Sequence, residues 1–172
     1  PGGYWSWVAT ALELVLIGGF AGGAVWGLYL MITCGLFGMH ALMTLGTRTL
    51  ERCAAIGAAL DTGFHVHAAE DPIDAQLTLE RHDRGIKHRF QDFGMAGSKT
   101  VFVHGSHLEP REMELLSSTG SMLVVNPESN MNNGLKVAPA LNFLRHGVMV
   151  GLGTDGMSAQ MIAQARAMYL HE

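Results

Sequence analysis

Apolar runs of strand length alternate with segments of helical periodicity along most of the chain. Continuous apolar runs predict strands at residues 63–69, 99–104, 121–126 and 148–154. Apolar residues spaced three or four apart predict helices at 47–60, 109–119, 137–146 and 158–170, and the charged segment 72–92 is expected to be helical with an interruption near Gly85. Because helices separate the strands and no hairpin turn joins them, we predict a parallel sheet covered on both faces, which is an α/β fold.

The first part of the chain has a different pattern. Residues 14–47 contain no Asp, Glu, Lys or Arg. Within them, the apolar run 14–37 is long enough to span a bilayer, and its glycines show the four-residue spacing that suits close helix contact in lipid. We therefore expect residues 1–34 to form an apolar, helical, membrane-like segment and residues 35–172 to form a separate domain. The alternative is that the run is a buried helix and strand of the globular fold.

Composition narrows the class of protein. The 172 residues suffice for one ordinary domain or for part of a larger one, and the chain starts at Pro1 and stops inside a helical pattern, so we expect a piece of a longer protein. The net charge is −4 without a basic run, which argues against a nucleic-acid partner. Two isolated cysteines suit a reducing compartment, so we expect a cytoplasmic protein, or a membrane-associated one if the segment 14–37 enters a bilayer.

Polar groups stand where three of the predicted strands end. His67 and Glu70 follow the first of these strands, His104 ends the second, and Asp155 follows the last. Side chains at the C-terminal ends of parallel strands form the active sites of α/β barrels. A neutral imidazole such as that of His67 can bind a divalent metal, Asp155 can be a second ligand, and Glu70 can exchange a proton with a nearby water.

Two other groups of polar residues allow more than one interpretation. We expect His65 to point to the opposite face of its strand from His67, outside the site. Residues 126–134 are rich in amide side chains and turn formers. They suit a plain polar turn, and they also suit a loop at the same end of the barrel in which Asn126 and Asn130 contact a substrate.

Four motifs in this order resemble the amidohydrolase superfamily, in its branch of cytosine and guanine deaminases and chlorohydrolases. They are HVHAAE at 65–70, VFVHGSHL at 101–108, NPESNMNNGLKVAP at 126–139 and VGLGTDG at 150–156. Within that branch the chain resembles the SsnA aminohydrolases. The resemblance covers about residues 35–172 and implies the C-terminal half of a (β/α)8 TIM barrel, strands four to eight, with a metal-dependent hydrolase of C–N bonds other than peptide bonds as the parent function.

The resemblance also implies a role for each candidate residue. His67 would be a metal ligand on strand five, Glu70 the proton shuttle, and His104 a contact to the hydrolytic water or the substrate. Asp155 would be a metal ligand that helps to activate the water, and His40 a substrate contact at the end of strand four. The metal would be zinc, or else iron, and the substrate a small purine-like, pyrimidine-like or related amidine or amide compound.

One feature of the family is missing from this sequence. The family carries a His-x-His pair on its first strand, whereas no histidine precedes His40 here, so the expected metal site is incomplete. The alternative function is therefore a catalytically incompetent half-barrel, anchored to a membrane or dependent on a partner chain. Because an open half-barrel exposes strand edges and apolar helix faces, we also expect self-association.

Overall fold

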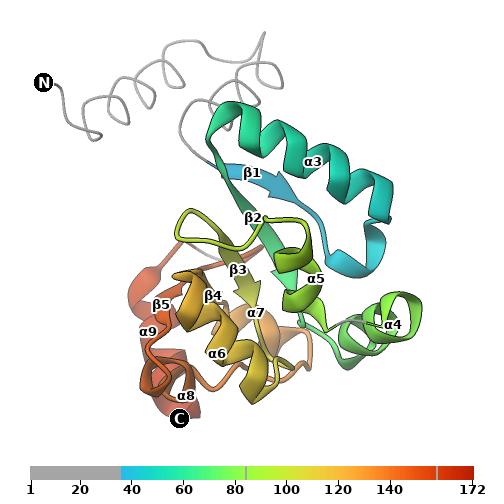
Figure 1. Cartoon of the computed structure of the whole chain (residues 1–172). Coiled ribbons are helices and arrows are strands. Elements are labelled where there is room, and N and C mark those ends of the chain that lie inside the picture. Colours follow the sequence, from blue (N-terminus) through green and yellow to red (C-terminus); the bar gives the residue numbers. More distant parts are fainter. Residues whose placement is uncertain (1–35, 84, 158) are drawn as a thin grey trace, which may run out of the picture.

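A five-stranded parallel sheet forms the centre of the protein in the computed structural model, which describes residues 36–83, 85–157 and 159–172. The strands lie side by side in chain order, and Figure 1 shows them stepping from β1 to β5 with helices between successive strands. This arrangement confirms the predicted parallel α/β fold. The strands are β1 (Leu36–Met39), β2 (Gly63–Ala68), β3 (Val101–His104), β4 (Met122–Val125) and β5 (Met149–Leu152).

The connections between strands are helical. After β1 come a 3-10 turn, η1 (Leu42–Thr44), and α3 (Thr47–Leu60); after β2 come α4 (Pro72–His82) and α5 (Ile86–Asp92). The remaining helices are α6 (Pro110–Thr119), α7 (Pro127–Asn132), α8 (Ala140–Arg145) and α9 (Met161–His171). The bounds of α3 agree with the prediction, and the expected interruption near Gly85 separates α4 from α5.

Two predictions between β4 and β5 were wrong, and prolines explain both. The segment expected to be a loop contains α7, because Pro127 at the first helical position already has the backbone angle that a helix needs. The helix expected at 137–146 shortens to α8, because Pro139 disfavours a helical conformation at the residue before it.

Aromatic packing joins the sheet to the helices. The ring of Phe64 on β2 meets that of Phe90 on α5 edge to face at 6.2 Å, and Phe90 meets Phe102 on β3 at 5.3 Å. Phe90 and Phe102 have no exposed surface. The core continues through Leu123 on β4 and Phe143 on α8, so it runs along most of the sheet and holds the strand ends at fixed positions.

The connection between β1 and α3 is held by a buried arginine. Arg89 on α5 is 2% exposed, and its guanidinium donates hydrogen bonds to the backbone carbonyls of Leu42 (3.3 Å) and Leu45 (2.9 Å). Exposed Arg81 adds a weaker tie, donating to the carbonyl of Met43 at 3.1 Å. These bonds fix the segment that immediately follows His40.

The membrane-like segment of the prediction falls on residues outside the described ranges, apart from the first residues of β1. Within the described ranges no helix combines the length and the apolar character needed to cross a bilayer.

Candidate metal centre

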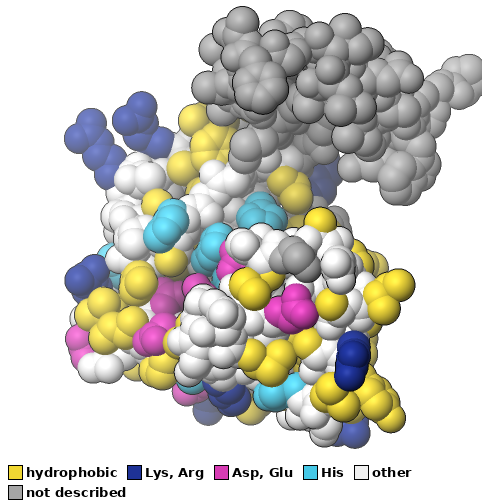
Figure 2. Space-filling model, turned by 180° about the vertical axis from the view of Figure 1, so that it is seen from behind, with side chains coloured by type: hydrophobic (Ala, Val, Ile, Leu, Met, Phe, Trp, Pro, Cys, Tyr) yellow, Lys and Arg dark blue, Asp and Glu magenta, His cyan; other side chains and the backbone are white. Residues whose placement is uncertain are grey.

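Three side chains, from β2, from β3 and from the loop that follows β2, converge at the C-terminal ends of these strands. The strands pair so that His67 lies opposite Val103 and Ala68 opposite His104, which places His104 one residue further along the sheet than His67. The Nε2 atom of His104 lies 3.2 Å from the Nδ1 atom of His67 and 3.6 Å from an Oε atom of Glu70. One ligand atom from each of the three residues falls within 4.8 Å of the others. Figure 2 shows histidine and acidic side chains close together in the middle of one face.

The donor set fits a divalent cation. Zinc binds imidazole nitrogens at about 2.0–2.1 Å, and tetrahedral geometry then separates two such nitrogens by roughly 3.3 Å. The 3.2 Å between His67 and His104 is close to that value. Two imidazoles and a carboxylate are also the kind and number of protein ligands found in catalytic zinc sites.

Electrostatics favours the neutral form of His67, which is the form that binds metals. Burial is the main cause that lowers the pKa of His67, and the neighbouring His104 lowers it further. The carboxylates of Glu70 and Asp155 act in the opposite direction. Asp155 is not one of the three residues whose ligand atoms lie within 4.8 Å of one another, but its charge acts on the pKa of His67.

Asp155 follows β5, and the neighbouring helix orients it. The hydroxyl of Ser129 on α7 donates a hydrogen bond of 2.6 Å to the Asp155 carboxylate. The strand end itself is tied to β4 by a hydrogen bond from the Gly153 amide to the Val125 carbonyl at 2.9 Å. Gly153 has no room for a side chain, because the amide oxygen of Asn126 occupies the place where a Cβ would stand.

The two predicted substrate-contacting asparagines are buried. Asn126 is 3% exposed, and Asn130 has no exposed surface. The Oδ1 atom of Asn130 lies 3.0 Å from the Nδ1 atom of His104, so this asparagine contacts the ring nitrogen that does not face His67. His40, by contrast, is exposed, and its ring stacks on that of His67 at 6.0 Å with an angle of 17°. Substrate contact by these three residues stays a prediction.

Left-handed backbone conformations are concentrated at this site. Five non-glycine residues in the described ranges have a positive φ, and two of them, Asp61 and Asp83, are ordinary helix C-caps. The other three are Ala69 (52°), His104 (73°) and Asp155 (49°). Such conformations cost energy for residues with a Cβ and are often found at functional sites.

Comparison with known proteins decides the family. Residues 31–172 match the profile of the amidohydrolase family. This chain belongs to the amidohydrolase family. The 5-methylthioadenosine/S-adenosylhomocysteine deaminase of Nitratidesulfovibrio vulgaris is 32% identical over 120 residues, which make up 70% of this chain and 27% of the relative. The chain thus spans about a quarter of the length of that deaminase.

Solved structures support the fold of this amidohydrolase. An adenosine deaminase from Xanthomonas campestris with bound zinc superposes with a TM-score of 0.74 at 23% identity, over 79% of this chain and 32% of the other. The guanine deaminase of E. coli gives a TM-score of 0.74 at 22% identity, over 79% and 33% of the two chains. The sheet is therefore part of a TIM barrel, as predicted. The particular likeness to SsnA stays a prediction.

In this amidohydrolase, the prediction that His65 points to the opposite face of its strand from His67 was wrong. Residues two apart on a strand point to the same face, and the rings of His65 and His67 lie 6.3 Å apart. Both are half-buried, while their neighbours Phe64 and Val66 are buried on the other side of the strand. The His-x-His spacing in the sequence already contained the signal that would have placed His65 beside the cluster.

Sequence reasoning also missed Asp74, which is 2% exposed on α4. Its carboxylate accepts hydrogen bonds from the backbone amides of Ala69 (2.8 Å) and Met43 (3.2 Å). Burial raises the pKa of Asp74, and these two hydrogen bonds oppose the rise. Asp74 thereby links the turn that carries Glu70 to the segment after His40. An Asp three residues into a helix looks like an ordinary first-turn charge in the sequence, so no pattern marked this contact.

Proposed function

We propose that this chain supplies metal-binding and proton-transfer groups to a hydrolase that removes an amino group from a small nitrogenous ring by cleaving a C–N bond. The observation that carries the proposal is the convergence of His67, Glu70 and His104 at the ends of two adjacent strands. Membership of the amidohydrolase family supports it. Because the chain spans only part of its relatives, the activity, the substrate and the partners are all proposals.

His67 and Asp155 would be ligands of the cation, and the Nε2 atom of His104 would face it. Zinc suits the imidazole and carboxylate donors best, and iron is the alternative. When bound, such a cation supplies Lewis acidity that makes water a better nucleophile at neutral pH. Tight zinc sites use four ligands, so further ligands in the place of the family's first-strand His-x-His pair would strengthen binding.

Glu70 is placed to move the proton. Its side chain is 29% exposed, so it can meet water, and one of its carboxylate oxygens faces the Nε2 atom of His104. We assign to Glu70 the uptake of a proton from the attacking water and its delivery to the departing amine. His104 is assigned a contact through its Nε2 atom to the cation or to the attacking water, and exposed His40 a contact to the substrate ring.

A purine-like substrate suits the relatives. The deaminase of N. vulgaris is named for 5-methylthioadenosine and S-adenosylhomocysteine, and the E. coli structure is that of a guanine deaminase. We therefore propose an aminopurine base or nucleoside rather than a pyrimidine. We also propose a cytoplasmic location, because the free thiol of Cys53 suits a reducing compartment.

Self-association remains part of the proposal. Large apolar side chains are exposed on α9 and β5, among them Ile162 (88%), Tyr169 (83%) and Met149 (67%). Surfaces of this kind are more often covered by protein than left in water. Light scattering during gel filtration tests the idea, and a monomer at micromolar concentration would contradict it.

The function is tested by metal and ammonia measurements on the full chain. Zinc is added, free metal is removed by dialysis, and bound zinc is measured for the wild type, for His67→Ala and for His146→Ala. The last variant changes the exposed histidine that caps the C-terminus of α8. Ammonia release is then measured with 5-methylthioadenosine, S-adenosylhomocysteine, adenosine and guanine. Zinc retention that is lost only in His67→Ala, together with ammonia release, supports the proposal.

Other outcomes count against it. Zinc retention without ammonia release from any of the four compounds favours the catalytically incompetent half-barrel. Absence of zinc binding, or equal binding by His67→Ala, overturns the assignment of the site.

A further inference from the structure

Asn130 is a buried amide whose hydrogen-bonding groups all have partners. Its Nδ2 atom lies 2.9 Å from the hydroxyl of Ser106 and 2.8 Å from the backbone carbonyl of Lys136. Its Oδ1 atom lies 3.0 Å from the Nδ1 atom of His104. A buried amide with three such contacts has a fixed position, so it can determine the state of the group that it faces.

The carbonyl of Lys136 settles which way the amide points. A carbonyl oxygen only accepts hydrogen bonds, so the amide atom beside it must be the NH2 group of Asn130. The amide oxygen must then face His104, and because that oxygen also only accepts, the Nδ1 atom of His104 must carry a hydrogen. We propose that Asn130 is a positioning residue that holds His104 in the tautomer protonated at Nδ1, with the lone pair of Nε2 directed into the site.

This tautomer determines what His104 can do. With its hydrogen on Nδ1, neutral His104 has a free lone pair on Nε2, the atom that faces His67 and Glu70. In the other tautomer, Nε2 would carry a hydrogen and could not bind a cation. A hydrogen-bond partner behind a metal-binding imidazole also fixes the plane of the ring and increases its basicity. The inference deepens the proposed function, on which its consequence for metal binding rests.

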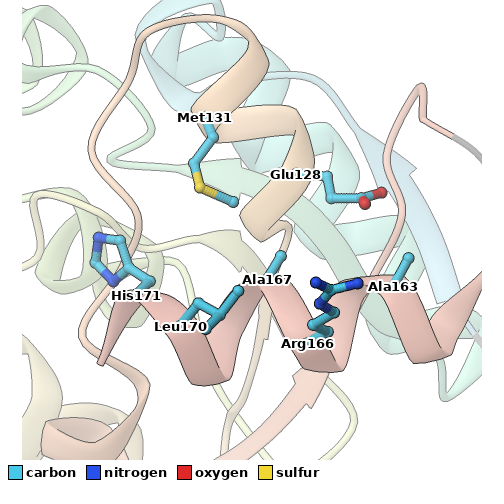
Figure 3. A pocket seen from close by; sticks show the side chains of 7 residues that line it. All are labelled: Glu128, Met131, Ala163, Arg166, Ala167, Leu170 and His171. Atoms are coloured by element: carbon cyan, nitrogen blue, oxygen red, sulfur yellow. The ribbon is translucent and has the colours of Figure 1, made fainter.

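The helix that carries Asn130 is itself anchored from α9. Gln164 on α9 has no exposed surface, its amide oxygen accepts a hydrogen bond from the Glu128 backbone amide at 3.3 Å, and its NH2 group donates to the Glu128 carboxylate at 2.5 Å. Figure 3 shows α7 and α9 side by side, with Glu128 and Met131 of α7 facing the α9 residues that line the same pocket. This contact holds a six-residue helix that is too short to be stable alone. Consecutive side chains of the anchored helix, Ser129 and Asn130, then orient Asp155 and His104.

The tautomer is measured directly by ¹⁵N–¹H NMR of the histidine rings in the metal-free full chain, at a pH where imidazoles are neutral. The resonances of His104 are identified from their absence in His104→Gln. We expect the wild type to show His104 protonated at Nδ1. We expect Asn130→Leu, which removes the acceptor, to give a mixture of the two tautomers, and Asn130→Asp, which restores an acceptor, to return the signal to the Nδ1 form.

A matched control separates this role from a general effect on the fold. Asn132→Leu makes the same change at an exposed position two residues further along α7, and it should leave the His104 spectrum unchanged. His104 protonated at Nε2 in the wild type overturns the inference, and so does an unchanged spectrum in folded Asn130→Leu. If Asn130→Leu does not fold, the wild-type spectrum decides alone.

A second measurement connects the tautomer to metal binding. Titration with zinc alone should show affinity reduced roughly 10- to 100-fold in Asn130→Leu and unchanged in Asn132→Leu. If the wild type binds no zinc, the proposed function fails, while the NMR result still stands or falls by itself. If Asn130→Leu has mixed tautomers but wild-type zinc affinity, the positioning role toward the metal is overturned.

Discussion

The Nε2 atom of His104 lies 3.2 Å from the Nδ1 atom of His67. Two imidazole nitrogens at this distance attract each other only if a proton or a cation lies between them, because two facing lone pairs repel. Burial lowers the pKa of His67, which favours its neutral form. A divalent cation between the two nitrogens would displace the hydrogen that they share.

Zinc should stabilise the protein through this pair. Binding to the folded state alone adds about 2.7 kcal/mol to the free energy of unfolding when free zinc is 100 times its Kd. We expect a higher Tm in differential scanning fluorimetry for the wild type and for His146→Ala, and no rise for His104→Ala. A rise of equal size in His104→Ala would show that zinc binds elsewhere.

Stability should fall as the pH drops below about 6.5. Burial lowers the pKa of His65 below its ordinary value, although a backbone hydrogen bond opposes this, and His67 shifts in the same direction. Between the ordinary and the lowered pKa, the unfolded chain binds a proton that the folded protein does not, so the free energy of unfolding decreases with falling pH.

Urea denaturation at several pH values from 7 to 5 measures how much the free energy of unfolding decreases with falling pH. This decrease should be smaller in His65→Gln than in the wild type, and smaller still when His67→Gln is added. A wild-type stability that increases over the same range would have the wrong sign for lowered pKa values.

Asp155 provides a test of backbone strain at the site. Its φ is +49°, a conformation that costs a residue with a Cβ about 1–2 kcal/mol and that glycine adopts freely. Asp155→Gly and Asp155→Ala both remove the hydrogen bond from Ser129, so the backbone is the main difference between them. We expect the glycine variant to be more stable by about 1 kcal/mol in urea denaturation. The usual order, with alanine more stable, would indicate that this backbone is not strained.

Replacing Arg89 should destabilise the β1–α3 connection. Arg89→Met removes the donor to the Leu45 carbonyl and one of two donors to the Leu42 carbonyl, which keeps the Leu45 amide. An unpaired buried group costs about 1–3 kcal/mol. Arg81→Met is the matched control, because Arg81 is exposed and should cost no more than about 0.5 kcal/mol. Equal losses in the two variants, measured by chemical denaturation, would contradict the role given to Arg89.

Patterns within one segment were sufficient to predict most of the fold. Apolar periodicity located β2, β3 and α3, since these elements are defined by the residues they bury. The same periodicity placed His67 and His104 at strand ends, and parallel pairing then brought them together. The two errors between β4 and β5 came from prolines, whose effect depends on whether the residue lies just inside a helix or just before one.

Contacts between distant segments could not be read from the sequence. Asp74 binds the amide of Met43, and Asn130 reaches His104 across 26 positions of the chain. Such polar contacts have no periodicity, because they depend on how helices and loops meet in three dimensions. The position of His65 was available from its spacing and was assigned to the wrong face.

The bond between Gln164 and Glu128 also has a consequence for the order of events during translation. Residues leave the ribosome from the N-terminus onward, so His104 and α7 emerge before Gln164 does. Until Gln164 emerges, the short helix lacks its anchor and the asparagine behind His104 has no fixed position. His104 is thus synthesised before the glutamine on which its final geometry depends.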